Sequence, residues 1–486
     1  MLKKLFIILI INVLYFSTSV YSQTESLIVE KDTNSLIIDT LQTEKQKKKF
    51  TLFKKKDQKD IVKKGISFGP LPVIAFDQDR GFQYGGLLNL YDYGDGSTYP
   101  VPRQQWYIEV SAYTKGSQQV FLTYDTKHLI PNVRMSIAAT FNHDMAMDFY
   151  GFNGYQAVYP ADSIKFWSKQ KDKTGMPDKY KNAFFRLERY IVTAKADFVG
   201  NIWKNKFFWE ASYYFSWNKY QSINFDKINK GKKEAEQFHS QTLFEKYQDW
   251  GIIPENEIGG GFTSALKAGL MFDTRDFEAA PSKGIWAEGH VLIAPKFMGT
   301  THPYYRYSLT FRHYIPCVKD KLVLAYRLHY RGTIGNYMPY YILPVFSTVG
   351  REYDRDGMGG YRTVRGIVRT RVQALDDAFF NVELRWKFVS FKLWKQNIYL
   401  GLNAFCDGAI SVRYYDVSYR GNGGTAMEDE YKQYISTAKD GLHAAAGGGF
   451  RIAINQNFII AVDYAYPFNK QDGLKGSLYV NTGYLF

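Results

Sequence analysis

The chain has 486 residues, of which 45% are hydrophobic, 17% aromatic and 22% charged, and its formal net charge at pH 7 is +15. Its 39 Tyr, 36 Phe and 40 Gly depart from the Leu, Ala and Glu that lead the composition of average soluble proteins. After residue 22 no apolar run approaches the roughly 18 residues of a spanning helix, which excludes a polytopic helical membrane protein, and aromatics this dense exclude a mostly disordered chain.

Residues 1–22 have the pattern of a secretory signal peptide. Lys3 and Lys4 form a positive start, and the apolar stretch 5–16 follows, interrupted only by Asn12. An N-terminal membrane anchor is the alternative, but the apolar run is too short to span a bilayer. We therefore expect an exported protein whose mature chain starts at Gln23.

Residues 23–64 form a basic segment with few aromatics and no clean periodicity. Lysines cluster at 45–49 and 54–56, a composition typical of a solvated, flexible segment rather than a domain. This segment is a candidate for contacts with periplasmic or lipoprotein partners. The sequence pI near 9.3 is compatible with nucleic acid, but for an exported chain we expect anionic lipid headgroups or lipopolysaccharide as partners and no nucleic acid.

After the basic segment, segments in which apolar and polar residues alternate with a period of two recur to the end of the chain. Between Phe207 and Trp217 every odd position is apolar or aromatic, whereas even positions include Glu210 and Asn218. Residues 321–330 show the same pattern. Side chains alternate between the two faces of a strand, so each segment has one apolar and one polar face.

The length of these segments separates a membrane barrel from a soluble β-sandwich, which would show the same alternation. Most run for roughly 10 to 14 residues, close to the length of a tilted transmembrane strand and above the usual soluble length. We therefore predict an all-β fold, a 16-stranded antiparallel transmembrane β-barrel over residues 65–486. The predicted strands are 65–76, 82–93, 104–115, 118–128, 132–143, 184–199, 204–218, 261–273, 283–296, 304–316, 319–332, 376–389, 396–408, 440–454, 457–467 and 474–486.

The spacing of the strands predicts their orientation. The four long gaps, 144–183, 219–260, 333–375 and 409–439, all follow odd-numbered strands, whereas the turns after even-numbered strands are mostly short. Bacterial barrels have even strand numbers, short periplasmic turns and longer extracellular loops. The four gaps are therefore predicted to be extracellular loops of a barrel in the bacterial outer membrane.

The first predicted strand contains two prolines two residues apart, Pro70 and Pro72. Because proline has no N–H group, both would weaken pairing along the same edge of the strand. An overhanging strand end is one explanation. The other is a lateral seam in the barrel wall, formed by this strand and by the last strand, which ends at Phe486.

The loop 333–375 carries Gly359-Gly360-Tyr361-Arg362-Thr363-Val364-Arg365-Gly366-Ile367. This sequence resembles the Val-Arg-Gly-aromatic motif of the outer-membrane assembly and two-partner-secretion superfamily, also called the BamA/TamA or bacterial surface antigen family. In that family the motif occupies the sixth extracellular loop, between strands eleven and twelve, which is where the strand count places it here. Ile367 stands where the family usually has Phe or Tyr.

Other segments resemble the family in the same order along the chain, and the resemblance covers roughly 65–486. They are the turn Phe272-Asp273-Thr274-Arg275-Asp276 with Pro281 and Gly284, the strand-twelve segment 381–385, Phe405-Cys406-Asp407-Gly408, and the closing strands from Gly447 through Asp463-Tyr464-Ala465 to Phe486. Family members usually carry periplasmic polypeptide-transport domains. Residues 23–64 are too few for one, so the chain resembles a variant without them.

The resemblance implies that the sixth loop folds into the barrel lumen and that Arg365 pairs with acids on the inner wall. Strand alternation places Glu383 and Asp407 on the lumen face, because their neighbours in sequence are apolar. A guanidinium gains most from bidentate carboxylates, and Gly366 allows a tight turn. The site predicted from the sequence is Val364, Arg365, Gly366 and Ile367, with Glu383 and Asp407 as partners; an ordinary exposed loop arginine is the alternative.

The sequence nominates no catalytic residue, cofactor or metal. The two cysteines and eight histidines show no zinc spacing, and no phosphate-binding loop or Gly-x-Ser-x-Gly motif is present. The run Asp354-Arg355-Asp356-Gly357 hints at a calcium loop, but Arg365 stands where the bidentate Glu would be required. We therefore expect no enzyme.

The resemblance implies insertion or translocation of polypeptides at the outer membrane without nucleotide hydrolysis. A weak seam between the first and last strands would admit a client β-strand by edge pairing. The alternatives are a barrel that handles lipid or lipopolysaccharide, a scaffold for a partner complex, a passive pore, and an enzyme. The identity of the client does not follow from the sequence.

Overall fold

The computed structural model describes residues 64–77, 81–99, 102–171, 173–278, 280–348, 355–393, 396–454 and 458–486. The predicted signal peptide and, apart from Lys64, the predicted basic segment lie outside these residues. Among the helices of the described residues, none is both long enough and apolar enough to span a membrane.

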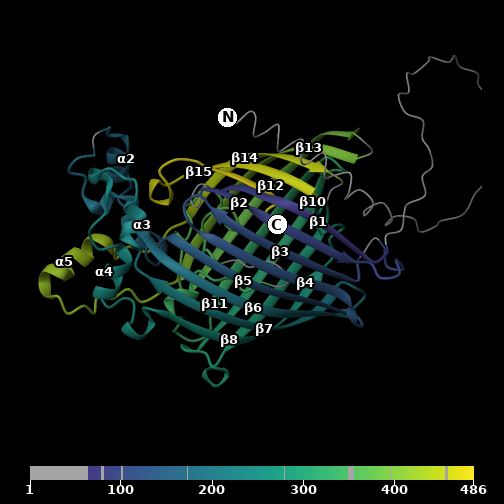
Figure 1. Cartoon of the computed structure of the whole chain (residues 1–486), viewed down its shortest axis with the longest axis horizontal. Coiled ribbons are helices and arrows are strands. Elements are labelled where there is room, and N and C mark those ends of the chain that lie inside the picture. Colours follow the sequence, from purple (N-terminus) through teal and green to yellow (C-terminus); the bar gives the residue numbers. More distant parts are fainter. Residues whose placement is uncertain are drawn as a thin grey trace, which may run out of the picture. The chain divides into compact units, whose positions relative to one another are not determined.

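Sixteen antiparallel strands of the described residues close into one barrel, in which each strand neighbours the next and β16 neighbours β1 (Figure 1). This confirms the predicted fold class. The strands are β1 (Ile66–Asp77), β2 (Gly81–Asp92), β3 (Gln104–Tyr113), β4 (Gln118–Ile130), β5 (Val133–Asp148), β6 (Arg186–Trp203), β7 (Phe207–Gln221), β8 (Gly260–Asp273), β9 (Gly284–Ala294), β10 (Tyr304–Val318), β11 (Leu322–Thr333), β12 (Asp376–Leu393), β13 (Gln396–Arg413), β14 (His443–Ile454), β15 (Phe458–Pro467) and β16 (Ser477–Thr482).

Contacts divide the chain into two units, and the small one comprises residues 1–67 and 91–103. In its described part, the N–H of Tyr93 donates to the carbonyl of Gly65 at 2.9 Å, and the N–H of Gly65 donates to the carbonyl of Gly94 at 2.8 Å. An ion pair of 2.6 Å joins Arg103 to Asp95 across the turn. The large unit, residues 68–90 and 104–486, holds most of the barrel wall and all the residues discussed below.

The wall has its polar face inside and its apolar face outside. On β7, Glu210 is 2% exposed and Asn218 is 1% exposed, whereas Trp209 is 37% and Tyr213 is 43% exposed. A soluble sheet would bury the aromatic face instead, because burial of apolar area stabilises it in water. This inverted pattern is typical of a barrel whose outer surface faces lipid.

The helices of the described residues lie in the connections between strands, and the four α-helices among them gather at one end of the strands (Figure 1). The α-helices are α2 (Ala161–Lys169), α3 (Phe225–Asn229), α4 (Leu243–Asp249) and α5 (Gly424–Tyr434). Short 3-10 helices are η2 (Gly154–Gln156), η3 (Asp178–Tyr180), η4 (Asn182–Phe185), η5 (Glu234–Glu236), η6 (Glu255–Glu257), η7 (Lys296–Met298), η8 (Tyr340–Ile342) and η9 (Lys470–Asp472).

The four long predicted loops share one hydrophobic core. Phe152, Trp250, Leu343 and Tyr434 come from the connections after β5, β7, β11 and β13, and all belong to the same buried cluster. The Phe152 ring lies 5.6 Å from that of Tyr247, and the Trp250 ring lies 5.6 Å from that of Tyr434. We call this cluster the loop cap. Aromatic packing of this kind holds the four loops together as one body.

The last strand is shorter than predicted, which corrects both the predicted range 474–486 and the placement of Phe486 in a seam strand. β16 ends at Thr482, and the next residue, Gly483, has φ +85°, which takes the chain out of the extended region. Phe486 is instead buried against Tyr314, Val323 and Ala325 of β10 and β11. The residues after Gly483, Tyr484-Leu485-Phe486, are all apolar, as those of a continuing membrane strand could be, so the sequence gives no warning of this turn.

Candidate functional site

The connection between β11 and β12 enters the lumen, and the predicted motif lies in its buried part. Val364 and Arg365 are 0% exposed and Ile367 is 1% exposed. The loop is closed on itself by a bridge between Met358 and Val372, and by the N–H of Gly360, which donates to the carbonyl of Ile367 at 2.8 Å. Val364 and Ile367 pack in one apolar cluster with Phe379 and Ala445 of the wall. The motif is therefore held by its own turn and by the wall.

Arg365 lies between carboxylates of the inner wall. Its Nε and Nη2 donate to the two oxygens of Asp407 at 2.8 and 3.1 Å, which is the bidentate arrangement. Nη2 lies 2.7 Å from Oε1 of Glu383, and Nη1 lies 3.3 Å from Oδ2 of Asp463. The guanidinium also lies 3.5 Å from the ring centre of Phe405. The structure thus brings the three residues named from the sequence, Arg365, Glu383 and Asp407, into contact.

Asp463 is a third carboxylate beside Arg365, in addition to the predicted partners Glu383 and Asp407. Alternation in β15 carried a usable signal, since Asp463 stands on the same face as the buried Ala461 and Ala465. Asp463 also forms an ion pair with Arg451 of β14, in which Nη1 of the arginine lies 2.6 Å from Oδ1 of the aspartate. Contact with a loop that follows β11 depends on curvature of the wall and could not be inferred from one strand.

A second arginine links the site to the end of the chain segment that follows β16. Arg385 Nε lies 2.7 Å from Oε2 of Glu383, the same carboxylate that pairs with Arg365. Its Nη2 donates to the main-chain oxygen of Phe486 at 2.8 Å, and its guanidinium lies 4.2 Å from the ring centre of Tyr484. Glu383 therefore joins the motif loop to the segment that β16 leads into. Arg365, Arg385 and Arg451 are balanced by Glu383, Asp407 and Asp463.

Gly366 connects the motif directly to β16. Its N–H donates to the hydroxyl oxygen of Tyr479 at 3.1 Å. It has φ +88°, and a Cβ there would lie 2.8 Å from Cβ of Ala445 and 3.0 Å from Cβ of Ala465. Both the left-handed backbone and the close approach to the wall require glycine. The closing strand therefore contacts the motif through a hydrogen bond from the Gly366 backbone to the Tyr479 side chain.

Replacing Gly366 by alanine should release the motif loop, because the added Cβ combines backbone strain with a clash. Gly335 in the same connection has φ +86° but no atom within 4 Å of a Cβ, so Gly335→Ala carries the strain alone. We expect Gly366→Ala to cost about 1–3 kcal/mol more than this control. Trypsin sensitivity of the loop in the folded protein measures the difference. Equal sensitivity of the two variants would contradict the tight fit of Gly366.

At the junction of β1 and β16, a strand of 12 residues meets a strand of six. All six residues of β16 pair with β15, whereas among the described residues only Phe76–Val480 and Asp77–Tyr479 pair β1 with β16. Pro70 and Pro72 lie in β1 outside this paired stretch, with exposed side chains. We call this junction the seam. In this register β16 ends opposite residue 74, so the earlier residues of β1 have no partner in β16, and an unpaired strand edge is the condition under which a strand accepts another chain.

Comparison with known proteins places these features in context. A model of the Omp85 superfamily domain matches residues 132–486. The fold is similar to the crystal structure of BamA from Haemophilus ducreyi lacking POTRA domains 1-3, with a TM-score of 0.51, 13% identity and coverage of 87% of this chain and 70% of that one. It is also similar to CdiB from Escherichia coli, with a TM-score of 0.51, 7% identity and coverage of 88% and 66%. No curated protein matches the sequence.

Proposed function

Because this chain belongs to the Omp85 superfamily, we propose that it aids insertion or translocation of polypeptides at the outer membrane, through the seam between β1 and β16. The observation that carries this proposal is the mismatch at the seam, where β1 has 12 residues, two of them prolines, and β16 has only six. In this mechanism a client β-strand pairs with an edge exposed at the seam and supplies the hydrogen bonds that the two strands lack with each other.

The motif loop would control the seam in this mechanism. The hydroxyl oxygen of Tyr479 accepts a hydrogen bond from the N–H of Gly366, and Tyr479 also stands opposite Asp77 in the register of β16 with β1. The segment after β16 is tied to Glu383 through Arg385, and Glu383 pairs with Arg365. A seated loop would therefore hold β16 in the closed position, and release of the loop would lower the barrier to opening.

The free energy for this process would come from the client. Each client strand that enters the membrane satisfies its backbone groups and exposes its apolar face to lipid, which is favourable without nucleotide. No catalytic group takes part, in keeping with the expectation that the protein is not an enzyme. We expect outer-membrane lipid or lipopolysaccharide to surround the barrel, and residues 23–64 to offer contacts to periplasmic or lipoprotein partners.

A passive pore is less consistent with the loop cap than a closed barrel is. The buried cluster contains Phe152, Trp250, Leu343 and Tyr434 from four different connections, and the motif loop occupies the lumen. Packed loops at one end and a loop inside the lumen both favour a closed barrel. The loop cap does not distinguish polypeptide clients from lipid, and the test below does so.

Depletion of the protein, followed by quantitative proteomics and lipid analysis of the outer membrane, tests the proposed function. We expect a subset of β-barrel or secreted proteins to fall at least about tenfold, because loss of a catalyst of insertion acts on its clients alone. Lipid and lipopolysaccharide composition should stay unchanged. Unchanged protein levels together with altered lipopolysaccharide would contradict the proposal and favour lipid handling.

A further inference from the structure

A glycine in the middle of three neighbouring strands brings two acids and a histidine together inside the barrel. In the strand register Glu210 of β7 stands opposite Gly269 of β8, and Gly269 stands opposite His290 of β9. A Cβ on Gly269 would lie 2.4 Å from Oε1 of Glu210 and 2.5 Å from Cβ of His290. The missing side chain on β8 therefore makes room for Glu210 and His290 to meet across it.

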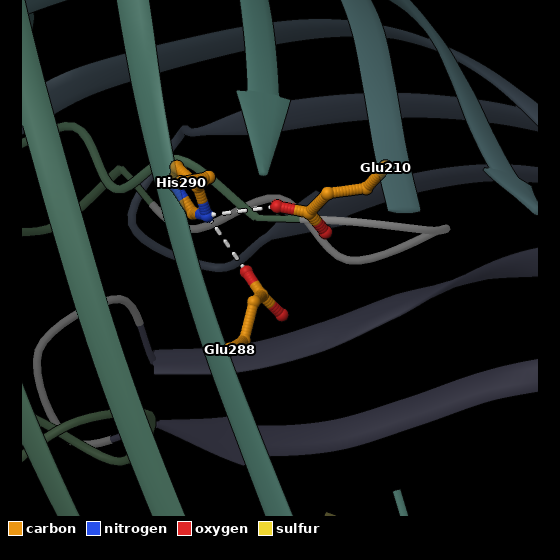
Figure 2. A group of neighbouring side chains, drawn as sticks. All are labelled: Glu210, Glu288 and His290. Carbon is orange, nitrogen blue, oxygen red and sulfur yellow. Dashed lines mark hydrogen bonds and ion pairs between the residues drawn. The ribbon is translucent and has the colours of Figure 1, made fainter. Parts of the chain in front are cut away.

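Three ligand atoms converge in this space, which Figure 2 shows. Nδ1 of His290 lies 2.8 Å from Oε1 of Glu288 and 3.3 Å from Oε1 of Glu210, and the three atoms all lie within 4.8 Å of one another. All three side chains are buried, with exposures of 6% or less. The three residues come from β7 and β9, which explains why spacing along the sequence contained no metal pattern.

Hydrogen bonding within the cluster leaves Glu210 unsatisfied. One Nδ1–H of His290 can serve the carboxylate of Glu288. Among the described residues, no group donates a hydrogen bond to either oxygen of Glu210, although the residue is only 2% exposed. In the part of the chain that the structure describes, its one ion pair is the 3.3 Å contact with His290, which Glu288 shares at 2.8 Å. One imidazolium is a weak counterion for two buried carboxylates, so a further cation would be favoured at this point.

The neighbouring cations are directed elsewhere. Lys267 on β8 donates to the carbonyl of Thr348 at 2.7 Å and lies 3.4 Å from Asp197. Arg312 on β10 lies with its guanidinium 4.3 Å from the ring centre of Trp286. Neither makes an ion pair with Glu210 or Glu288 among the described contacts, so their charges act on the two carboxylates only over longer distances. A bound cation would be a direct partner of both carboxylates.

We propose that Glu210, Glu288 and His290 bind one divalent transition-metal ion of the Zn²⁺ class. Zinc takes carboxylate oxygen and imidazole nitrogen at about 2.0–2.2 Å, so its tetrahedral ligand atoms stand roughly 3.3 Å apart. The separations of 2.8 and 3.3 Å found here are close to that value. Three protein ligands leave a fourth position for water. The ion would cross-link β7 to β9 over Gly269 and stabilise the wall there.

Zinc binding to the purified full-length chain tests this proposal. The protein is stripped with a chelator, titrated with Zn²⁺ by calorimetry, and assayed for metal content after dialysis. We expect one zinc ion per chain, and binding weakened by more than about 100-fold in Glu210→Gln and in His290→Gln. The control is His329→Gln, since His329 is another buried lumen histidine, bonded to Thr310 instead. It should bind zinc as the unaltered chain does.

Folding of each variant is checked by its heat-dependent mobility in detergent gels, and X-ray absorption on the unaltered chain is independent of the variants. The zinc edge should show a nitrogen and oxygen shell with one imidazole and no sulfur. Absence of zinc binding by the folded chain would overturn the proposal. So would full binding by His290→Gln, or a spectrum with sulfur or with several imidazoles.

Discussion

Replacing Arg365 by alanine is expected to abolish function while leaving the barrel folded. The side chain is fully buried, and its removal leaves Glu383, Asp407 and Asp463 facing one another with less compensating charge. Removing one partner of a buried ion pair typically costs about 3–5 kcal/mol. Here this cost would destabilise the seated loop, which lies inside the barrel, relative to a released loop. Because 1.4 kcal/mol is tenfold, the seated state should lose more than about 100-fold in population. Arg365→Lys should not restore it, since lysine cannot form the bidentate fork.

The measurements for this prediction are complementation of a depleted strain and trypsin sensitivity of the loop in the folded protein. Arg362→Ala is the matched control, because Arg362 lies three residues away in the same loop with an exposed side chain. We expect Arg362→Ala to complement fully and to keep the loop protected. Normal complementation by Arg365→Ala would contradict the role of the motif in the proposed mechanism.

A disulfide across the seam is expected to block function reversibly. Phe76 and Val480 stand opposite each other in the seam, and opposed strand residues have the Cβ spacing that a disulfide needs. The double variant Phe76→Cys/Val480→Cys, with Cys317 and Cys406 replaced by serine, should lose activity at least about tenfold when oxidised, because a covalent bond prevents a client strand from entering. Reduction should restore it. Complementation with and without reductant measures the effect.

The control for the seam disulfide shares one of its cysteines. Val462 of β15 stands opposite Val480 on the other edge of β16, so Val462→Cys/Val480→Cys closes a ladder that is already complete. This pair should leave activity unchanged in both redox states. Equal loss of activity in both oxidised pairs would show that rigidity of β16, rather than opening of the seam, is what matters.

Most of the barrel could be predicted from the sequence because alternation reports directly which face of a strand meets lipid. The predicted strand 204–218 corresponds to β7 (Phe207–Gln221), and 376–389 corresponds to β12 (Asp376–Leu393). Strand ends were less well predicted, since alternation fades where the strand leaves the membrane. The predicted end of the last strand was wrong because the chain turns inward at Gly483. The apolar residues that follow this glycine do not reveal the turn.

The candidate site could be predicted only in part, for a reason of geometry. Alternation places Glu383 and Asp407 in the lumen, but it cannot tell which lumen residues of distant strands meet. The contacts of Asp463 with Arg365 and of Tyr479 with Gly366 depend on closure of the barrel, which brings β15 and β16 to the loop after β11. The meeting of Glu210 and His290 likewise depends on the absence of a side chain at Gly269.

Opening of the barrel between β1 and β16 is tested by insertion of a β-barrel client into liposomes. These liposomes contain the purified full-length protein with the Phe76→Cys/Val480→Cys pair. Client folding is followed by protease protection and by heat-dependent mobility in gels. We expect the reduced protein to accelerate insertion over empty liposomes by at least about tenfold, and the oxidised protein not to do so. Equal acceleration in both redox states would contradict a function that depends on opening between β1 and β16.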